Sequence, residues 1–214
     1  RDQVDLVYVW GIAFCKAVAP LAERAKVPLV AQCIDPEIAR NRSYVVRFMN
    51  YTDQYLRATT HYLASQNRNR LAVVVTDNAY LEEMLQAFKR TRQPNQEIAE
   101  LQRYQAAEMD FRSTISRLRT GSYDAIGVFL SAGQIAAFFR QLREQGISIT
   151  SFGTNFFESL SEIEAAQGAM EGAIFANNEV ALPFVERFRQ KFGKVSQIGF
   201  GSLAYEFALT LGQI

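Results

Sequence analysis

The chain has 214 residues, of which 49% are apolar, 12% aromatic and 21% charged. Its 23 basic and 22 acidic side chains leave a formal charge of +1, so the sequence offers no broad positive surface for nucleic acid or anionic lipid. A chain of this length buries a large core without help from disulfides or metals, which excludes disordered and small-scaffold proteins.

Short apolar runs alternate with segments of helical periodicity, which predicts an α/β protein with parallel sheets flanked by helices. Several apolar runs are continuous in Val, Ile, Leu and Phe, as expected of strands covered on both faces. In chain order we expect strands at Leu6 to Val9, Leu29 to Ala31, Leu71 to Thr76, Ile98 to Tyr104, Ala125 to Leu130, Ile147 to Phe152 and Ala173 to Ala176, and helices at Ala17 to Ala25, Thr52 to Ser65, Tyr80 to Arg90, Phe111 to Arg119, Ile135 to Gln145, Leu182 to Phe192 and Ser202 to Gln213.

Local signals support the ends of several helices. Asp110 is placed to cap the amides that follow it, Gly146 stands where a left-handed C-terminal cap is expected, and Pro183 falls in the first turn of its helix. The segments 47–50 and 176–179 each lead from an apolar run into a polar stretch before a helix. We interpret both as candidates for a crossing of the backbone between two sheets.

The sequence contains no candidate membrane span and no recognisable targeting segment. The longest uncharged run, Ala125 to Phe139, contains polar residues and is shorter than the ~18 apolar residues of a membrane span. The first residues lack a Met, a basic segment and a cleavage site, so we expect the chain to be truncated at its N-terminus.

Cys15 and Cys33 are the two cysteines, and no CxxC or Cys/His spacing suited to zinc occurs. Both follow predicted strands, and two interpretations stay open: a pair of buried thiols, or a single bridge in an oxidising compartment. His61, the single histidine, is interpreted as a structural residue of its helix. No metal or cofactor is expected.

Open parallel sheets bind ligands beyond the carboxyl ends of their strands. In this sequence those positions carry aromatic and hydrogen-bonding side chains with one or two carboxylates, a composition that suits binding a small molecule better than transforming it. Aromatic residues follow three different predicted strands, which favours a pocket with aromatic walls. The predicted ligand-binding residues are Trp10, Gly11, Ile12, Ala13, Phe14, Cys15, Cys33, Ile34, Asp35, Tyr80, Ser131, Ala132, Asn155 and Phe156, with no catalytic residue among them.

A glycine pattern resembling a dinucleotide fingerprint occurs at Gly199 to Ala204. That fingerprint needs a preceding strand and an acidic residue about 20 positions further on, and the sequence provides neither. We therefore interpret the pattern as a loop that opens the last helix.

The carboxylates form no evident acid/base pair. Asp77 follows a strand, Asp124 precedes one and so lies at the opposite sheet edge, and Glu82 and Glu83 fall in the first turn of a helix, where the dipole favours them. An α/β enzyme is the alternative class, with Ser131 or Cys15 as nucleophile, but neither has a visible histidine partner.

Short segments then occur in an order that is characteristic of one family. They are Val4 to Gly11, Ala17 to Ala22, Val27 to Val30, Leu71 to Asp77 with Tyr80, Glu108 to Phe111, Ile115 to Leu118, Tyr123 to Ile126, Phe138 to Leu142 with Gly146, Glu171 and Gly172, Phe188 to Phe192, and Ala204 to Ala208. In this order the chain resembles the type I periplasmic substrate-binding proteins, specifically the branched-chain amino acid group of ABC transporters.

The resemblance implies two Rossmann-like lobes joined by crossing strands, with the ligand held in the cleft and a hinge that closes on binding. It implies that residues 1–49 and 179–214 form an incomplete first lobe and residues 50–178 the second. It also implies that the first two βα units of lobe one and the final crossing are missing from this chain.

Departures from the family pattern concern the ligand. Ile12 to Cys15 replace the small hydroxyl residues usual after the first glycine, and Gln32 to Asp35 replace an Ala-Thr pair. The acid that the family has for the α-amino group is expected near Asn155, which is neutral. Both ends of the zwitterion clamp are lost, which predicts an aromatic or amide-like ligand in place of an ordinary branched-chain amino acid.

The function implied is that of a non-enzymatic, extracytoplasmic solute-binding protein, periplasmic or extracellular and with or without a lipid anchor. Two partners are implied: a small molecule that is amino acid-like, an amide or aromatic, and the membrane permease of an ABC uptake transporter. No nucleic-acid partner is expected. Alternatives are the sensing domain of a signalling receptor and the effector core of a repressor.

Overall fold

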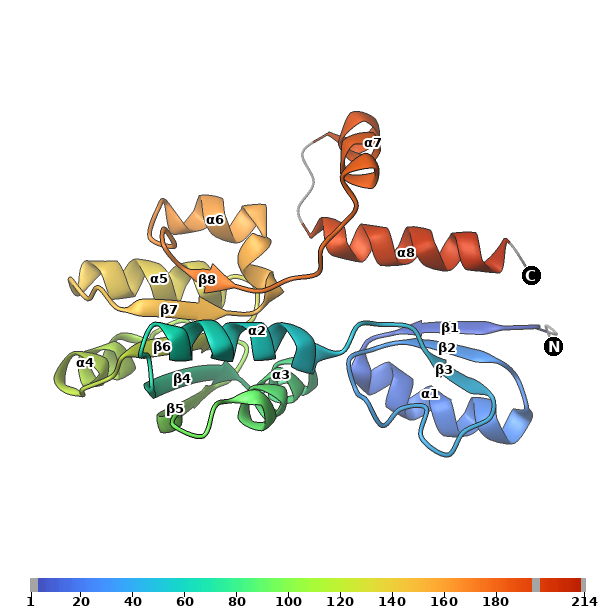
Figure 1. Cartoon of the computed structure of the whole chain (residues 1–214), viewed down its shortest axis with the longest axis horizontal. Helices are drawn as coiled ribbons and strands as arrows, with labels where there is room; N and C mark the ends of the chain where they lie inside the picture. Colours follow the sequence, from blue (N-terminus) through green and yellow to red (C-terminus); the bar gives the residue numbers. More distant parts are fainter. Residues whose placement is uncertain (1–3, 194–196, 213–214) are drawn as a thin grey trace. The chain divides into compact units, whose positions relative to one another are not determined.

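The computed structural model describes residues 4–193 and 197–212, and the elements are labelled in Figure 1. By their contacts the residues divide into two compact units, Arg1–Gln54 and Tyr55–Ile214. Each unit contains its own parallel sheet. The α/β class with parallel sheets and flanking helices is therefore confirmed.

The first unit holds β1 (Val7–Trp10), α1 (Ile12–Ala25), β2 (Leu29–Gln32) and β3 (Val45–Arg47), and its three strands pair in the order β1-β2-β3. Helix α1 covers one face of this sheet with residues spaced three and four apart, which places them on one side of the helix. These buried residues of α1 are Ile12, Cys15, Ala19 and Ala22.

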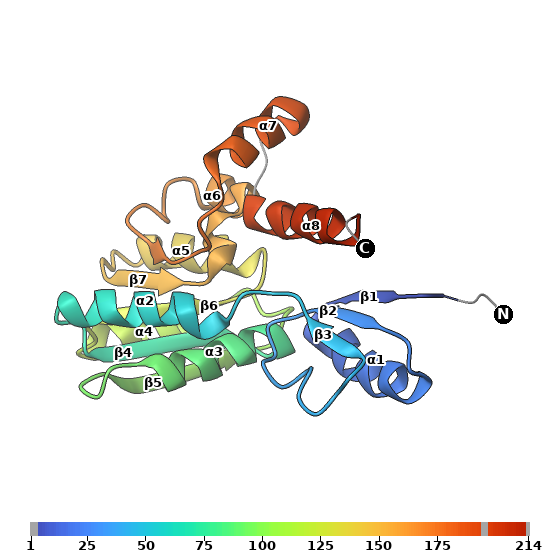
Figure 2. The same cartoon turned by 45° about the vertical axis from the view of Figure 1, so that its right-hand side comes forward.

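The second unit contains a five-stranded parallel sheet in the order β5-β4-β6-β7-β8. Helices α5 and α6 pack against each other next to β7, as Figure 2 shows from a second angle. In chain order the elements are α2 (Thr52–Ser65), which begins just before the unit boundary, β4 (Arg70–Thr76), α3 (Ala79–Thr91), β5 (Glu97–Tyr104), α4 (Arg112–Thr120), β6 (Ala125–Phe129), α5 (Gln134–Glu144), β7 (Thr150–Gly153), the 3-10 turn η1 (Asn155–Glu158), α6 (Leu160–Ala166), β8 (Ile174–Phe175), α7 (Leu182–Phe192) and α8 (Ile198–Leu211).

Strand β6 is buried along its whole length because helices cover both faces of this sheet. On one face Phe88 of α3 meets Phe129 and Phe152, with ring centroids 5.8 and 5.2 Å away. On the other face Phe111 and Phe138, 5.5 Å apart, join a core built from α4 and α5. The second unit therefore has two hydrophobic layers around one sheet.

The local helix signals are largely confirmed. Gly146 adopts a positive φ of 67°, and Pro183 lies in the first turn of α7. Asp110 accepts a hydrogen bond from the Arg112 amide at 3.1 Å, whereas the Phe111 amide donates to the side chain of Gln141 at 2.7 Å. The cap of α4 is thus shared between a local residue and one from α5.

The predicted start of the first helix at Ala17 is wrong. Helix α1 begins at Ile12, directly after Gly11, whose φ of 95° lets the chain turn out of β1. The expected loop from Ile12 to Cys15 is therefore the first turn of a helix. The spacing of the buried residues Ile12, Cys15 and Ala19 is the sequence pattern that indicates this earlier start.

Three further elements differ from expectation. Strand β3 and helix α6 were not predicted, because one is very short and the other follows polar residues. The glycine segment at 199–204 is not a loop, since α8 begins at Ile198 and includes it. A Cβ on Gly201 would come within 3.0 Å of Phe188 Cζ, so this glycine allows α7 and α8 to approach closely.

The segment 47–50 begins with the last residue of β3 and leads toward α2, next to the boundary between the two units. The segment 176–179 follows β8 and precedes α7. The grouping of residues 179–214 with the first lobe stays a prediction.

Candidate ligand-binding site

Side chains predicted to bind ligand meet at the carboxyl edge of the second sheet. Tyr80 lies in the first turn of α3 after β4, and Asn155 and Phe156 lie in η1 after β7. The Tyr80 hydroxyl donates to Oδ1 of Asn155 at 2.8 Å, and its ring stacks on Phe156 with centroids 5.1 Å apart and planes 19° from parallel. The fold thus joins residues separated by 75 positions in the sequence.

The end of β6 adds hydroxyl and amide groups to the same sheet edge. Nδ2 of Asn78 donates to Oγ of Ser131 at 3.0 Å, and the Asn78 side chain also caps α3 by accepting from the Leu81 amide at 2.8 Å. The next residue, Ala132, is exposed. We call Asn78, Tyr80, Ser131, Asn155 and Phe156 together the edge cluster.

The edge cluster contains no charged side chain, and each of its members is partly exposed. Burial raises the pKa of Tyr80 above that of an ordinary phenol, so this hydroxyl remains a hydrogen-bond donor at neutral pH. The cluster therefore offers one aromatic surface together with neutral donors and acceptors.

The N-terminus of α5, which follows Ser131, is occupied by another side chain. Glu162 of α6 is 4% exposed and accepts hydrogen bonds from the amides of Gly133 and Ala136, the latter at 2.8 Å. Helix N-termini attract anions, and here the protein supplies its own carboxylate. This helix end is therefore not free for the carboxylate of a ligand.

A carboxylate that the sequence reasoning missed follows the edge cluster at Glu158. One of its oxygens accepts from Nδ2 of Asn177 at 2.9 Å, while Oε1 is buried and has no hydrogen-bond partner among the described residues. Burial raises the pKa of this carboxyl above its usual range. Glu158 thus links η1 to the segment 176–179.

The predicted site residues of the first unit fall into two groups. Trp10 and Phe14 are 63% and 70% exposed, and Ala13 is also exposed, with Gly11 beside them. The side chains of the second group are packed inside the unit, so contact of this group with a ligand stays a prediction. The buried group consists of Ile12, Cys15, Cys33, Ile34 and Asp35.

Asp35 is engaged within the protein. One of its oxygens lies 3.0 Å from Nζ of Lys16, and the other accepts from the Glu37 amide at 2.9 Å. Both carboxylate oxygens therefore already have partners on the first unit.

The other acidic residues considered above have structural partners. Glu82 pairs with Arg103 at 2.7 Å and Glu83 with Arg90 at 2.8 Å. Asp124 accepts from the amides at the amino end of β4, which confirms its place at the opposite sheet edge. Oδ2 of Asp77 accepts a hydrogen bond from Nε2 of Gln105 at 3.4 Å.

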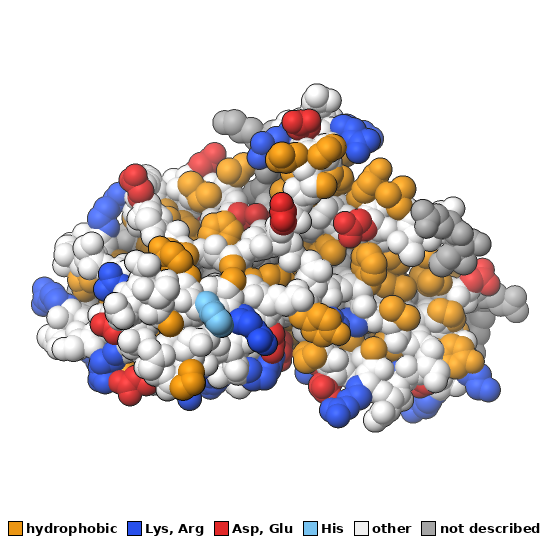
Figure 3. All heavy atoms as spheres, viewed as in Figure 1, with side chains coloured by type: hydrophobic (Ala, Val, Ile, Leu, Met, Phe, Trp, Pro, Cys, Tyr) orange, Lys and Arg blue, Asp and Glu red, His pale blue; other side chains and the backbone are white. Residues whose placement is uncertain are grey.

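His61 is an exposed residue of α2, visible in pale blue in Figure 3. Among the described residues no group of three or more His, Cys, Asp and Glu side chains is arranged to hold a metal ion.

In the part of the chain that the structure describes, no helix is both long and apolar enough to cross a bilayer.

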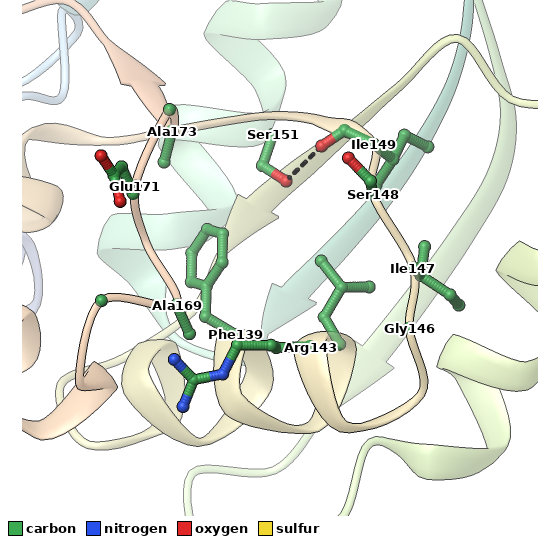
Figure 4. Close-up of a pocket in the computed structure, with 13 residues that line it drawn as sticks. Phe139, Arg143, Gly146, Ile147, Ser148, Ile149, Ser151, Ala169, Glu171 and Ala173 are labelled. Carbon is green, nitrogen blue, oxygen red and sulfur yellow. Dashed lines mark hydrogen bonds between the residues drawn. The ribbon is translucent and has the colours of Figure 1, made fainter.

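A cavity of about 310 Å³ lies at the other edge of the second sheet. Figure 4 shows Phe139 and Arg143 of α5 facing Ala169 and Ala173, with Ile147 and Ile149 on the segment that leads into β7. These segments precede β7 and β8, so the cavity borders the amino ends of the strands and is separate from the edge cluster.

Comparison with known proteins identifies the family to which the chain belongs. A family model described as "Periplasmic binding protein" matches residues 1–213. The chain belongs to the periplasmic binding protein family. It is a family of binding proteins, which confirms the expected absence of enzymatic activity. No curated protein matches the chain significantly in sequence.

Solved structures share the fold of this family member. The branched-chain amino acid transporter substrate-binding protein LivJ from Streptococcus pneumoniae, in complex with isoleucine, is 20% identical with a TM-score of 0.76, over 95% of this chain and 61% of that one. The leucine-binding protein LivK from Thermotoga maritima is 23% identical with a TM-score of 0.78, over 96% and 62%. A solute-binding protein from Rhodopseudomonas palustris, in complex with 3,4-dihydroxybenzoic acid, is 23% identical with a TM-score of 0.68, over 89% and 56%.

This periplasmic binding protein chain spans about three-fifths of the length of the first two of these structures. At identities below 25% the likeness concerns the fold. Two of these proteins are described with an amino acid ligand, isoleucine or leucine, and the third is in complex with an aromatic acid. The chemistry of the edge cluster must therefore decide which ligand class fits this chain.

Proposed function

We propose that this chain is the ligand-binding part of an extracytoplasmic solute-binding protein that delivers a small molecule to the permease of an ABC uptake transporter. Family membership and the fold support the binding role. The proposal places the protein in the periplasm or outside the cell, with residues 1–49 and 179–214 in the first lobe and residues 50–178 in the second.

Apolar surfaces support this division into lobes. Helix α7 has no buried residue, and Phe184 and Phe188 of α7 lie with Tyr205 of α8 around a hollow of about 420 Å³. In the first unit Tyr8 and Val46 are 40% and 59% exposed on the sheet. A parallel sheet is normally covered on both faces, and large exposed apolar surfaces mark sites of interaction, so each of these surfaces is suited to burial.

The observation that carries the ligand proposal is the neutral, aromatic character of the edge cluster. A carboxylate binds an α-amino group more strongly than a neutral acceptor does, and Asn155 is neutral and offers only an amide. The flat stack of Tyr80 on Phe156 offers an aromatic wall, and Ser131 offers a hydroxyl. We infer a ligand with an aromatic ring or an amide in place of a zwitterionic branched-chain amino acid.

A thermal-shift screen with leucine, isoleucine, 4-hydroxybenzoate and benzamide tests this proposal. A ligand at 100 times its dissociation constant stabilises the folded state by about 2.7 kcal/mol, which raises the melting temperature measurably. We expect a shift with an aromatic acid or amide and none with leucine. Micromolar binding of leucine, measured by isothermal titration calorimetry, would refute the ligand class while leaving the binding role intact.

A further inference from the structure

The two cysteines are brought together by the backbone of the first unit. Trp10 of β1 is paired with Gln32 of β2, and the Gly11 amide donates to the Gln32 carbonyl at 3.0 Å. Cys33 follows Gln32 directly, and Cys15 lies one helical turn after Gly11, to which its amide donates at 2.9 Å. The first turns of α1 therefore stand against the end of β2.

The thiols meet in the interior of this unit. Cys15 is 0% exposed and Cys33 is 2% exposed, and both are free thiols. Sγ of Cys15 lies 3.4 Å from the carbonyl oxygen of Val9, and the two thiols are close enough that each alters the pKa of the other. The chain has no other cysteine, so neither thiol has a competing partner within it.

An ion pair holds the same two segments next to the thiols. Lys16, the neighbour of Cys15, binds Asp35 at 3.0 Å, two positions after Cys33. The Asp35 side chain is itself held by the Glu37 amide. The approach of α1 to the segment after β2 is thus supported by contacts that do not involve sulfur.

We propose that Cys15 and Cys33 are a modification site: they are oxidised to an intrachain disulfide that ties α1 to the end of β2. The physiological part of this proposal rests on the proposed extracytoplasmic function, because that is where thiols meet oxidising partners. The capacity of the two thiols to pair rests on the geometry of the first unit alone.

The oxidant is a disulfide, either a small-molecule disulfide or that of a thiol-oxidising protein. One of the two thiols loses its proton and attacks the oxidant, which forms a mixed disulfide and releases one thiolate. The other thiol then loses its proton, attacks the protein sulfur of the mixed disulfide and displaces the second thiol of the oxidant. In sum, two cysteine thiols and one disulfide become one protein disulfide and two thiols, so electrons and protons balance.

Burial decides when this exchange occurs. Burial and the neighbouring Cys33 raise the pKa of the Cys15 thiol to about 12, and burial also raises that of Cys33, although hydrogen bonds from Cys15 and from the Asp35 backbone oppose the rise. Because the thiolate is the reacting form, exchange in the folded protein is slow. Oxidation during folding, when the thiols are exposed, is the faster route.

The test compares refolding of the full chain with oxidised glutathione and with a reducing agent. We expect the oxidised product to weigh about 2 Da less than the reduced protein. Proteolysis without reduction should yield one linked peptide that contains both Cys15 and Cys33. Two glutathione adducts, or two thiols that still react with maleimide after denaturation, would overturn the proposal.

Variants and melting curves separate this bridge from accidental oxidation. Cys15→Ser and Cys33→Ser should each abolish the loss in mass, and the wild-type measurement stands even where a variant folds poorly. The bridged protein should melt several degrees above the reduced protein, because the bridge restricts the unfolded chain. A bridged protein that melts below the reduced one would show that the bridge distorts the native structure, which contradicts the proposal. None of these readouts depends on the transported ligand.

Discussion

The hydroxyl of Tyr80 donates a hydrogen bond to Oδ1 of Asn155 across 2.8 Å, and the Tyr80 ring stacks on Phe156 beside it. One contact fixes the orientation of the amide and the other fixes the aromatic plane. Two strand ends of the second sheet are therefore locked together at the edge where a ligand is proposed to bind. We therefore expect loss of this contact to change both the stability of the protein and its affinity for the ligand.

Tyr80→Phe removes the hydroxyl and keeps the ring. We expect the free energy of unfolding to fall by about 1 kcal/mol, the usual net contribution of one hydrogen bond. The affinity for the ligand found in the screen should fall several-fold, because the Asn155 amide is no longer held in place. Urea denaturation and calorimetry measure the two effects. Tyr62→Phe, at a residue that is 47% exposed on α2, is the matched control, and equal effects in both variants would contradict the assignment.

Glu162→Gln tests the carboxylate at the N-terminus of α5. The variant keeps the shape of the side chain but removes its charge from a site that two backbone amides create. We expect a loss of about 1–2 kcal/mol in the free energy of unfolding, because charge-assisted hydrogen bonds are stronger than neutral ones. Glu164→Gln changes an exposed residue of the same helix and should have little effect. If both variants denature at the same urea concentration, Glu162 does not act as a helix cap.

Gly127→Ala tests the close packing over β6. A Cβ at this position would come within 2.8 Å of Phe152 Cζ, so the ring must move. Overpacking of this kind costs about 1–3 kcal/mol in the free energy of unfolding. Adding Phe152→Leu should make the combined loss smaller than the sum of the two single losses, because the smaller side chain leaves room for the methyl group. Strict additivity in urea denaturation would rule out the steric explanation.

Asp124→Asn tests the acid sensitivity of the second unit. Asp124 accepts hydrogen bonds from the amides of Asn69 and Arg70, at 2.9 and 2.7 Å, and these bonds lower the pKa of its carboxyl below the usual range. A carboxyl whose pKa is lowered in the folded state stabilises the protein at pH values above the unfolded-state pKa of about 3.9. This stabilisation is lost as the pH falls through the folded-state pKa.

We therefore expect wild type to lose more stability than Asp124→Asn between about pH 6 and pH 3, measured as the shift of the urea midpoint. Glu179→Gln, at an exposed carboxylate, should retain the wild-type pH dependence. An Asp124→Asn protein with the full acid sensitivity of wild type would show that these hydrogen bonds do not favour the charged form.

The amino-acid sequence by itself determined the α/β class and most of the helices and strands. Continuous apolar runs such as Leu71 to Thr76 mark strands covered on both faces, and local punctuation at Gly146 and Pro183 marks helix ends. These features depend on neighbours along the chain, so they can be read without knowledge of the fold. The aromatic and amide residue types at the strand ends were visible for the same reason.

Only the tertiary structure decided which of these residues touch. Strand β3 exists because Glu23 of α1 accepts the amides of Ser43 and Tyr44 and because β2 pairs with it, and no local pattern reports such distant partners. The same holds for Glu162 at the start of α5 and for the approach of the Cys15 segment to the end of β2. Hydrogen bonding and burial between segments far apart in the sequence depend on how the sheet orders its strands, and sheet order is a property of the folded chain.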